Sequence, residues 1–156
     1  MQAPERLGPD DPRLRQVLRL IQQSFAYMDG RIDPPSSMHR LTLAALSQQA
    51  DAAEVWALGD PVAACVVLTA RPDCLYLGKL AVDGQLRRAG LARRMVDLAA
   101  ARAAALGLPA LELQVRIELV ENQAAFARLG FVETGRSAHP GYDRPTSLTL
   151  RRALGS

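Results

Sequence analysis

The stretch that decides the fold reads Leu80-Ala81-Val82-Asp83-Gly84-Gln85-Leu86-Arg87-Arg88-Ala89-Gly90-Leu91-Ala92. An apolar strand runs into a short loop with two arginines and small residues, and the loop runs directly into an alanine-rich segment with helical spacing. The start of a helix carries unpaired backbone N–H groups and a partial positive charge. Because small residues let an anion reach that backbone, the stretch predicts a site for a phosphate or pyrophosphate group.

Two familiar phosphate-binding loops do not fit this stretch. It lacks the Gly-Lys-Ser/Thr ending of a P-loop. It also lacks the pattern Gly-x-Gly-x-x-Gly followed about 20 positions later by an acidic residue, which is typical of dinucleotide-binding loops. From the loop alone, an ordinary strand–turn–helix connection with solvated arginines remains an open alternative.

The elements on either side of the stretch alternate between helical and strand-like periodicity. Helices are predicted from Asp10-Asp11-Pro12 to before Gly30, and from Ser36 or Ser37 through Ala45. Later elements are strands over 54–58, 62–68 and 74–82, a helix over 90–106, a strand over 111–115, a helix over 119–129, and strands over 131–134 and 146–150. This order predicts an α/β (α+β) fold with a mostly antiparallel central sheet flanked by helices, in a single domain over residues 1–156.

The composition excludes several classes of protein. The 156 residues are 49% hydrophobic and 22% charged, which is typical of a globular domain, and the net charge is only 19 − 16 = +3. Cys65 and Cys74 lie in apolar, strand-like stretches without metal-ligand spacing, so we expect buried free thiols and no metal. Neither a signal-peptide pattern nor a membrane-length apolar run occurs, which predicts a cytoplasmic protein with no membrane partner.

Two motifs together resemble the GNAT acetyltransferase family. The family signature is Gln or Arg, then any two residues, Gly, any one residue, and Gly or Ala. Arg87-x-x-Gly90-x-Ala92 matches this signature, and the preceding Leu80-Ala81-Val82-Asp83 looks like the end of the strand that comes before it in the family. The segment 124–131 resembles its second landmark, a short helix ending in Gly-Phe. The resemblance implies an enzyme that moves an acetyl group from acetyl-CoA to a primary amine, by direct attack in a ternary complex.

The resemblance also assigns residues to the cofactor site, where two strands splay apart. It implies that the main chain of Leu80, Ala81 and Val82 pairs with the pantetheine arm of CoA. It further implies that the pyrophosphate is cradled by the backbone of Arg87, Arg88, Ala89, Gly90, Leu91 and Ala92. Asn122 is a candidate contact to the CoA arm, because Leu119 stands where the family often has asparagine; a helix-capping role for Asn122 is the alternative.

The family's usual acid and base are missing at their expected positions. Phe126 stands where a tyrosine often protonates the leaving thiolate, and Gln114 stands where a carboxylate base sometimes lies. Glu112 shares the strand face of Gln114 and is a candidate base. In the turn-rich loop 139–145, Tyr142 is a candidate acid and His139 a candidate base, the alternative being an ordinary surface loop.

The acceptor is expected to be a small-molecule or peptide amine. Tyr27, Asp29 and Asp33 precede two prolines in the segment that borders the acceptor cleft in the family, and with Tyr142 they are candidates for holding a cationic amine. A rigid turn with solvated acids is the alternative. Because dimers are common in that family, a homodimer is one expected assembly.

Two other functions are weighed against the enzyme. A CoA-binding sensor or interaction module that has lost catalysis would explain the missing tyrosine and carboxylate. A nucleic-acid-binding domain would explain the pI of about 9.3, but it needs aromatic side chains near its basic residues. Only seven aromatic residues occur (1 Trp, 3 Tyr and 3 Phe) and none adjoins the arginine loop, so no nucleic-acid partner is expected.

Overall fold

A seven-stranded sheet forms the centre of the molecule. The structure is a computed structural model that describes residues 3–26, 28–84, 86 and 90–155. Its strands are β1 (Glu5–Leu7), β2 (Glu54–Leu58), β3 (Ala64–Ala70), β4 (Leu75–Val82), β5 (Ala110–Arg116), β6 (Val132–Ser137) and β7 (Ser147–Ala153). They lie in the order β1-β2-β3-β4-β5-β7-β6, and all neighbouring pairs are antiparallel except β4 and β5. The predicted mostly antiparallel sheet is confirmed.

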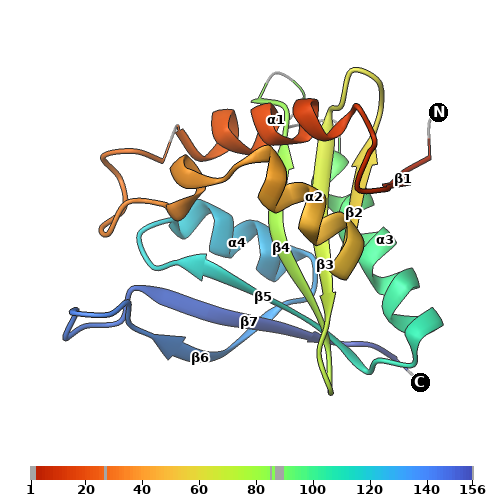
Figure 1. Ribbon diagram of the computed structural model, residues 1–156. Coiled ribbons are helices and arrows are strands. Elements are labelled where there is room, and N and C mark those ends of the chain that lie inside the picture. The colour runs from red at the N-terminus through yellow and green to blue at the C-terminus, as the bar shows by residue number, and fades with distance from the viewer. Residues whose placement is uncertain (1–2, 27, 85, 87–89, 156) are drawn as a thin grey trace.

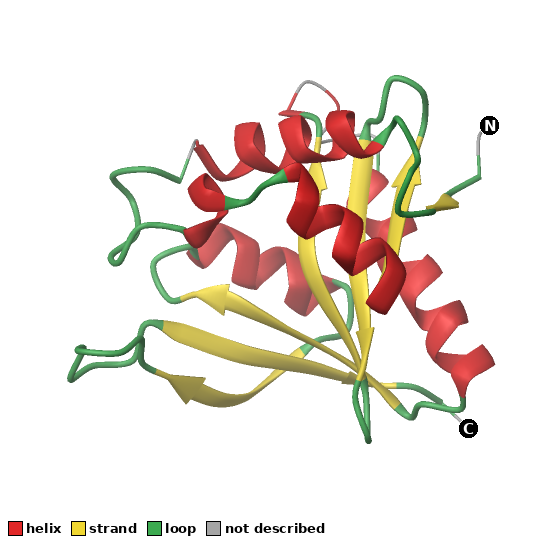
Figure 2. Cartoon of the chain, in the orientation of Figure 1, coloured by secondary structure: helices red, strands yellow, loops and turns green. Residues whose placement is uncertain are grey.

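The helices cover both faces of this sheet, as predicted. They are α1 (Leu14–Ala26), α2 (Leu43–Ala52), α3 (Leu91–Leu106) and α4 (Val120–Arg128), with a 3-10 turn η1 (Ser37–Arg40). Helices α1 and α2 pack on one face and α3 on the other (Figures 1 and 2). The apolar stripe of α1, which includes Val17 and Ile21, is fully buried in one core cluster, and Met95 and Ala99 of α3 are fully buried in a second one.

The prediction missed one strand, and several of its boundaries differ from the structure. The sequence did not indicate β1, which is only three residues long and takes its place by pairing with β2. The prediction of one continuous second helix is wrong. Ser36 caps η1, and Leu41 after it is extended. Thr42 then caps α2 by accepting a hydrogen bond from the Ala45 N–H. Helix α1 begins at Leu14, since Asp11 forms a turn with Arg13 before it.

The two cysteines are free and buried, as predicted. Burial raises the pKa of the Cys65 thiol to about 12, which keeps it protonated and unreactive at neutral pH.

Strand β4 contains one more residue than its partner β3. The register changes from Cys65↔Ala81 to Val67↔Gly78, so Lys79 and Leu80 oppose the single residue Val66. Lys79 has φ 53°, a left-handed backbone that a lysine rarely adopts. Such a bulge bends a strand and increases its twist.

The bulge lies where β4 parts from β5. These two strands pair only at Leu75↔Leu111 and Tyr76↔Glu112, although β4 continues to Val82 and β5 to Arg116. They converge at one end and diverge toward the other (Figure 1). The predicted splaying of two neighbouring strands is therefore present, between β4 and β5.

Arg102 lies on the apolar face of α3, where the sequence alone gives it no partner. Its guanidinium donates two hydrogen bonds to the carboxylate of Glu54 on β2, at 2.9 and 2.8 Å. The indole N–H of Trp56 donates to the same carboxylate at 2.8 Å. The Glu54 residue is only 9% exposed, so this ion pair fixes α3 to β2 at a site with little water to replace it.

Replacing Arg102 with methionine should lower the free energy of unfolding by about 2 kcal/mol at neutral pH, because it leaves a buried carboxylate without its charge partner. Arg102 holds the pKa of Glu54 below its usual value. The contribution of the pair is therefore present above the ordinary glutamate pKa and is lost as the pH falls through the lowered pKa. Urea denaturation at several pH values should show that the difference in free energy of unfolding between the variant and the wild type becomes smaller as the pH falls.

The matched control is Arg93→Met, which removes an exposed arginine from the same helix. It should change the free energy of unfolding by less than about 0.5 kcal/mol. Equal losses in the two variants would contradict a specific role for the Glu54 pair.

Candidate active site

A cleft of about 720 Å³ opens where β4 and β5 diverge. Its walls come from residues 77–80 of β4, residues 113–116 of β5, helix α4, the segment 28–40 before and within η1, and the loop between β6 and β7. Sequence-predicted site residues that line it are Leu80, Asn122, His139 and Tyr142, together with Gln114 and Phe126 at the family's base and acid positions. Segments far apart in the chain therefore meet at one cavity.

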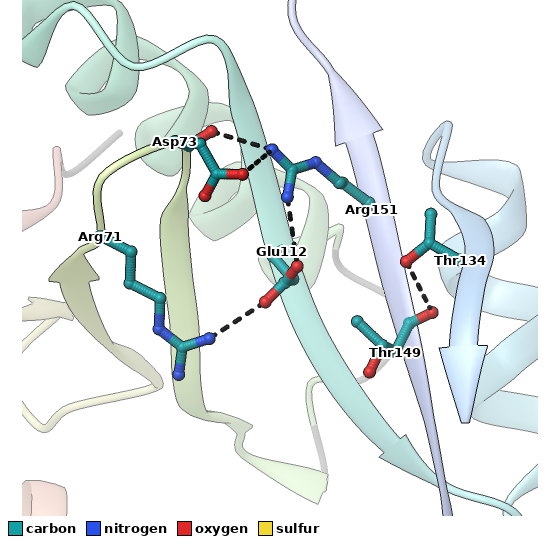
Figure 3. A network of polar contacts seen from close by, with 6 residues as sticks. All are labelled: Arg71, Asp73, Glu112, Thr134, Thr149 and Arg151. Atoms are coloured by element: carbon teal, nitrogen blue, oxygen red, sulfur yellow. Dashed lines mark hydrogen bonds and ion pairs between the residues drawn. The ribbon is translucent and has the colours of Figure 1, made fainter. Parts of the chain in front are cut away.

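The closed end of the divergence is fixed by ion pairs around Glu112. Its carboxylate accepts from Arg71 at 3.0 Å and from Arg151 at 3.3 Å, and Arg151 also donates to the carbonyl oxygen of Asp73 at 2.9 Å (Figure 3). These residues come from β5, β7 and the turn between β3 and β4. Glu112 does not line the cleft, so the structure gives this candidate base a position in a structural ion-pair network.

Tyr142 lies at the opposite, open end and is bound to the segment before η1. Its hydroxyl donates to Asp33 Oδ1 at 2.7 Å, while Arg144 donates to Asp33 Oδ2 at 3.2 Å. The hydrogen bond to the Asp33 carboxylate raises the pKa of Tyr142, which keeps its hydroxyl protonated at neutral pH. Both oxygens of Asp33 are thus occupied by the loop between β6 and β7.

His139 is held in the cleft by the buried hydroxyl of Thr146. Thr146 Oγ1 accepts from the backbone N–H of His139 at 2.9 Å and lies 3.4 Å from the carbonyl oxygen of Ser137. It also contacts His139 Nδ1. If the hydroxyl donates to Ser137, the contact is satisfied when Nδ1 carries the ring proton, and Nε2 is then the basic nitrogen.

The start of α3 is available to an anion. Gly90 is its N-cap residue with φ 75°, and no side chain of the described residues caps the helix. A Cβ built on Gly90 would meet no described atom within 4 Å. Leu91 packs into the core through its side chain and Ala92 follows it in the helix, so the backbone of this first turn is the part that remains for a ligand.

The remaining predicted residues divide into three groups. Tyr27, Arg87, Arg88 and Ala89 lie outside the described residues. Ala81 and Val82 continue β4 beyond the cleft lining, with Ala81 buried against the α1 and α2 cluster. Asp29 does not line the cleft, because its carboxylate binds His39 Nε2 at 2.7 Å.

The cleft is also lined by three cations that the sequence did not single out, of which Arg40 belongs to η1. Lys79 lies at the bulge, and Arg116 is the last residue of β5. A signal for the bulge is present in the sequence: the apolar residues that pack toward α3 are Leu75 and Leu77, then Leu80 and Val82, so their alternation slips by one position around Lys79.

Comparison with known proteins identifies the class of enzyme. A sequence model of the Acetyltransferase (GNAT) family matches residues 14–131. The chain belongs to this family, and it is therefore an acyltransferase that uses acetyl-CoA. No curated protein matches the chain significantly.

Solved structures of this family share the fold at low sequence identity. The ribosomal-protein-S18-alanine N-acetyltransferase from Escherichia coli is 22% identical, with a TM-score of 0.73 over 100% of this chain and 96% of that chain. Ard1 from Thermoplasma volcanium is 18% identical, with a TM-score of 0.77 over 99% of each chain. A GNAT acetyltransferase from Elizabethkingia anophelis, solved with acetyl-CoA bound, is 12% identical, with a TM-score of 0.70 over 98% of each chain.

The described residues contain neither a membrane-spanning helix nor a cluster of metal ligands. In residues 3–26, 28–84, 86 and 90–155, no helix has the length and apolar character needed to span a bilayer. Within the same ranges, no three His, Cys, Asp or Glu side chains lie together in a way that could hold a metal ion.

Replacing Gly90 with asparagine should weaken acetyl-CoA binding at least tenfold while the chain stays folded. Asparagine tolerates the left-handed backbone at a cost of about 1 kcal/mol, and no described atom opposes its Cβ. A ligand lying against the helix start would meet the new side chain, whereas the described residues leave it free. Calorimetric titration measures the affinity, and the thermal midpoint reports folding.

Gly107→Asn is the matched control, because Gly107 ends the same helix with φ 72° and an equally open Cβ direction. It should lose a similar amount of stability and bind acetyl-CoA normally. Equal affinities in the two variants would remove the helix start from the donor site.

Proposed function

We propose that the protein is an N-acetyltransferase of one domain over residues 1–156, which transfers the acetyl group of acetyl-CoA to a primary amine by direct attack in a ternary complex. The observation that carries the proposal is the divergence of β4 and β5. Beyond Tyr76, the edge of β4 that faces β5 has no strand partner, and it borders the cleft. An extended ligand arm with amide groups can pair with such an edge.

The donor site continues from this edge to the start of α3. The pantetheine arm would run along residues 80–82, and the pyrophosphate would bind the loop 87–92, where Gly90 leaves space and the helix start supplies N–H donors. Asn122 lines the same cleft from α4 and would contact the arm. The thioester would then lie between β4 and β5, open to the loop 139–145.

The reaction needs one proton removed and one proton supplied. The amine nitrogen bonds to the thioester carbonyl carbon, the carbon–sulfur bond breaks, and the thiolate takes a proton to leave as CoA. His139 is the proposed base, with Nδ1 held by Thr146. Tyr142 is the proposed acid, since its hydroxyl carries a proton at neutral pH and can donate it to the sulfur as the carbon–sulfur bond breaks.

Calorimetric titration with acetyl-CoA and CoA, with ATP as the control nucleotide, tests the donor site. Saturable binding of the first two and much weaker binding of ATP supports it, and no binding to a folded sample overturns it. Binding without acetyl transfer to any amine would favour the alternative of a CoA-binding sensor, for which Phe126 in place of the family tyrosine is the argument.

Replacing His139 with glutamine should lower kcat/KM about 100-fold and leave acetyl-CoA affinity unchanged, because glutamine keeps a polar group but cannot take up a proton. The pH profile is the decisive measurement. A general base and the acceptor amine each shape the dependence of the rate on pH, so the variant should keep only the contribution of the amine. An unchanged profile would exclude His139 as the base.

Replacing Tyr142 with phenylalanine should lower kcat about tenfold and spare acetyl-CoA affinity. Asp33→Asn is the matched control, since it weakens the same loop contact but keeps the tyrosine hydroxyl. If Tyr142 supplies the proton, Asp33→Asn should retain most of the rate. Equal losses in both variants would show that the contact only holds the loop.

A further inference from the structure

The charges that line the cleft are all positive. Arg40 of η1, Lys79 of β4 and Arg116 of β5 line it, and no aspartate or glutamate does so among the described residues. A cavity lined by one sign of charge raises the local concentration of ligands of the opposite sign.

Lys79 is the most informative of the three cations. It is the only lysine in a chain that uses arginine at its other 18 basic positions. It is half-buried, and desolvation lowers its pKa, with no carboxylate acting against that shift. In the part of the chain that the structure describes, no salt bridge includes Lys79.

Lys79 and Arg40 lie on the side of the cleft away from α3. Both also line a second hollow, of about 550 Å³, with residues of α2 and Thr69. On β5, Leu113 and Val115 pack into the core cluster shared with α3, while Gln114 and Arg116 point to the opposite face. The start of α3, where the proposed function places the CoA pyrophosphate, is therefore a separate feature from these cations.

Arg116 has unused hydrogen-bonding capacity at the same face. One of its terminal nitrogens donates to the carbonyl oxygen of Pro34, but its buried Nε has no partner in the described structure. Glu118 and Asp33 lie near enough to favour its charge. One Glu118 oxygen accepts from the Asp33 N–H and the other is buried without a hydrogen bond among the described residues, while the Asp33 oxygens are bound to Tyr142 and Arg144.

We infer that the acceptor carries a carboxylate beside its amine, as a free amino acid does, and that Lys79 and Arg40 bind this carboxylate with Arg116 at its flank. The inference rests on the proposed function and adds a negative group to the cationic amine expected from the sequence. A charge-assisted contact between the carboxylate and Lys79 would also stabilise the charged form of Lys79, which burial disfavours. Polyamines and aminoglycosides, which carry several positive charges, would meet repulsion here.

The test is an acceptor panel assayed with the purified full-length chain and acetyl-CoA. It contains the free α-amino acids, the matched amino acid amides, and spermidine and an aminoglycoside as polycations. We expect at least one amino acid to have a kcat/KM at least tenfold above that of its amide. Its amide has the less basic amine, so more of it is unprotonated at neutral pH, and a preference for the acid opposes intrinsic reactivity.

Variants then assign the preference to residues. Lys79→Met should lower the ratio of kcat/KM for the amino acid to that for its amide by roughly ten- to a hundredfold, the usual effect of losing one charge-assisted contact. Arg40→Gln should lower the same ratio in the same direction. Arg19→Gln, which removes an exposed arginine of α1 outside the cleft, should leave the ratio unchanged.

The outcomes separate the inference from the proposed function. If amides or polycations are the best acceptors, if no amino acid is acetylated by a chain that binds acetyl-CoA, or if Lys79→Met affects acid and amide equally, the inference is overturned and the donor site stands. If acetyl-CoA does not bind and no amine is acetylated, the proposed function itself fails.

Discussion

The extra residue at Lys79 in β4 is the constraint on which the site depends. A regular β4 would continue to pair with β5, and the sheet would be closed where the cleft now lies. Pairing instead ends at Tyr76, and the bulge with its left-handed Lys79 follows three residues later, where it bends the part of β4 that no longer pairs with β5. The bulged part of β4 therefore has a free edge toward β5, and its Lys79 lines the cavity between the two strands.

A divergence of this kind also requires a fixed end, and the ion pairs of Glu112 supply it. Arg71 precedes β4 and Arg151 lies on β7, so the carboxylate joins the strands on both sides of β5 at the level where β4 and β5 still pair. The side chain is mostly shielded from water, which strengthens each contact. The acid on β5 that shares the face of Gln114 is thus used to hold the sheet together.

The sequence predicted the parts of this structure that local chemistry determines. The strand before the arginine loop and the helix after it, the turn residues of the β2–β3–β4 hairpins and the stripe of α1 were all found in place. Contacts between distant residues could not be predicted in this way. Glu112 was expected to be a candidate base because its strand face was known, whereas its partners are 41 and 39 positions away. The break between η1 and α2 depends on the capping hydrogen bond of the Thr42 side chain, which competes with the helix propensity of the surrounding residues.

The charge of the proposed acceptor site also depends on contacts between distant residues, which the local sequence does not show. Asp29 and Asp33 stand close together in the sequence and suggest a pocket for a cation, but in the fold His39, Tyr142 and Arg144 occupy their carboxylates. The cations that line the cleft come from three separate elements, so they do not stand together in any one segment of the sequence. A buried or half-buried charge without a counter-charge is unfavourable in the free protein. Lys79 is therefore better explained by a ligand that brings the missing negative charge than by any partner within the described chain.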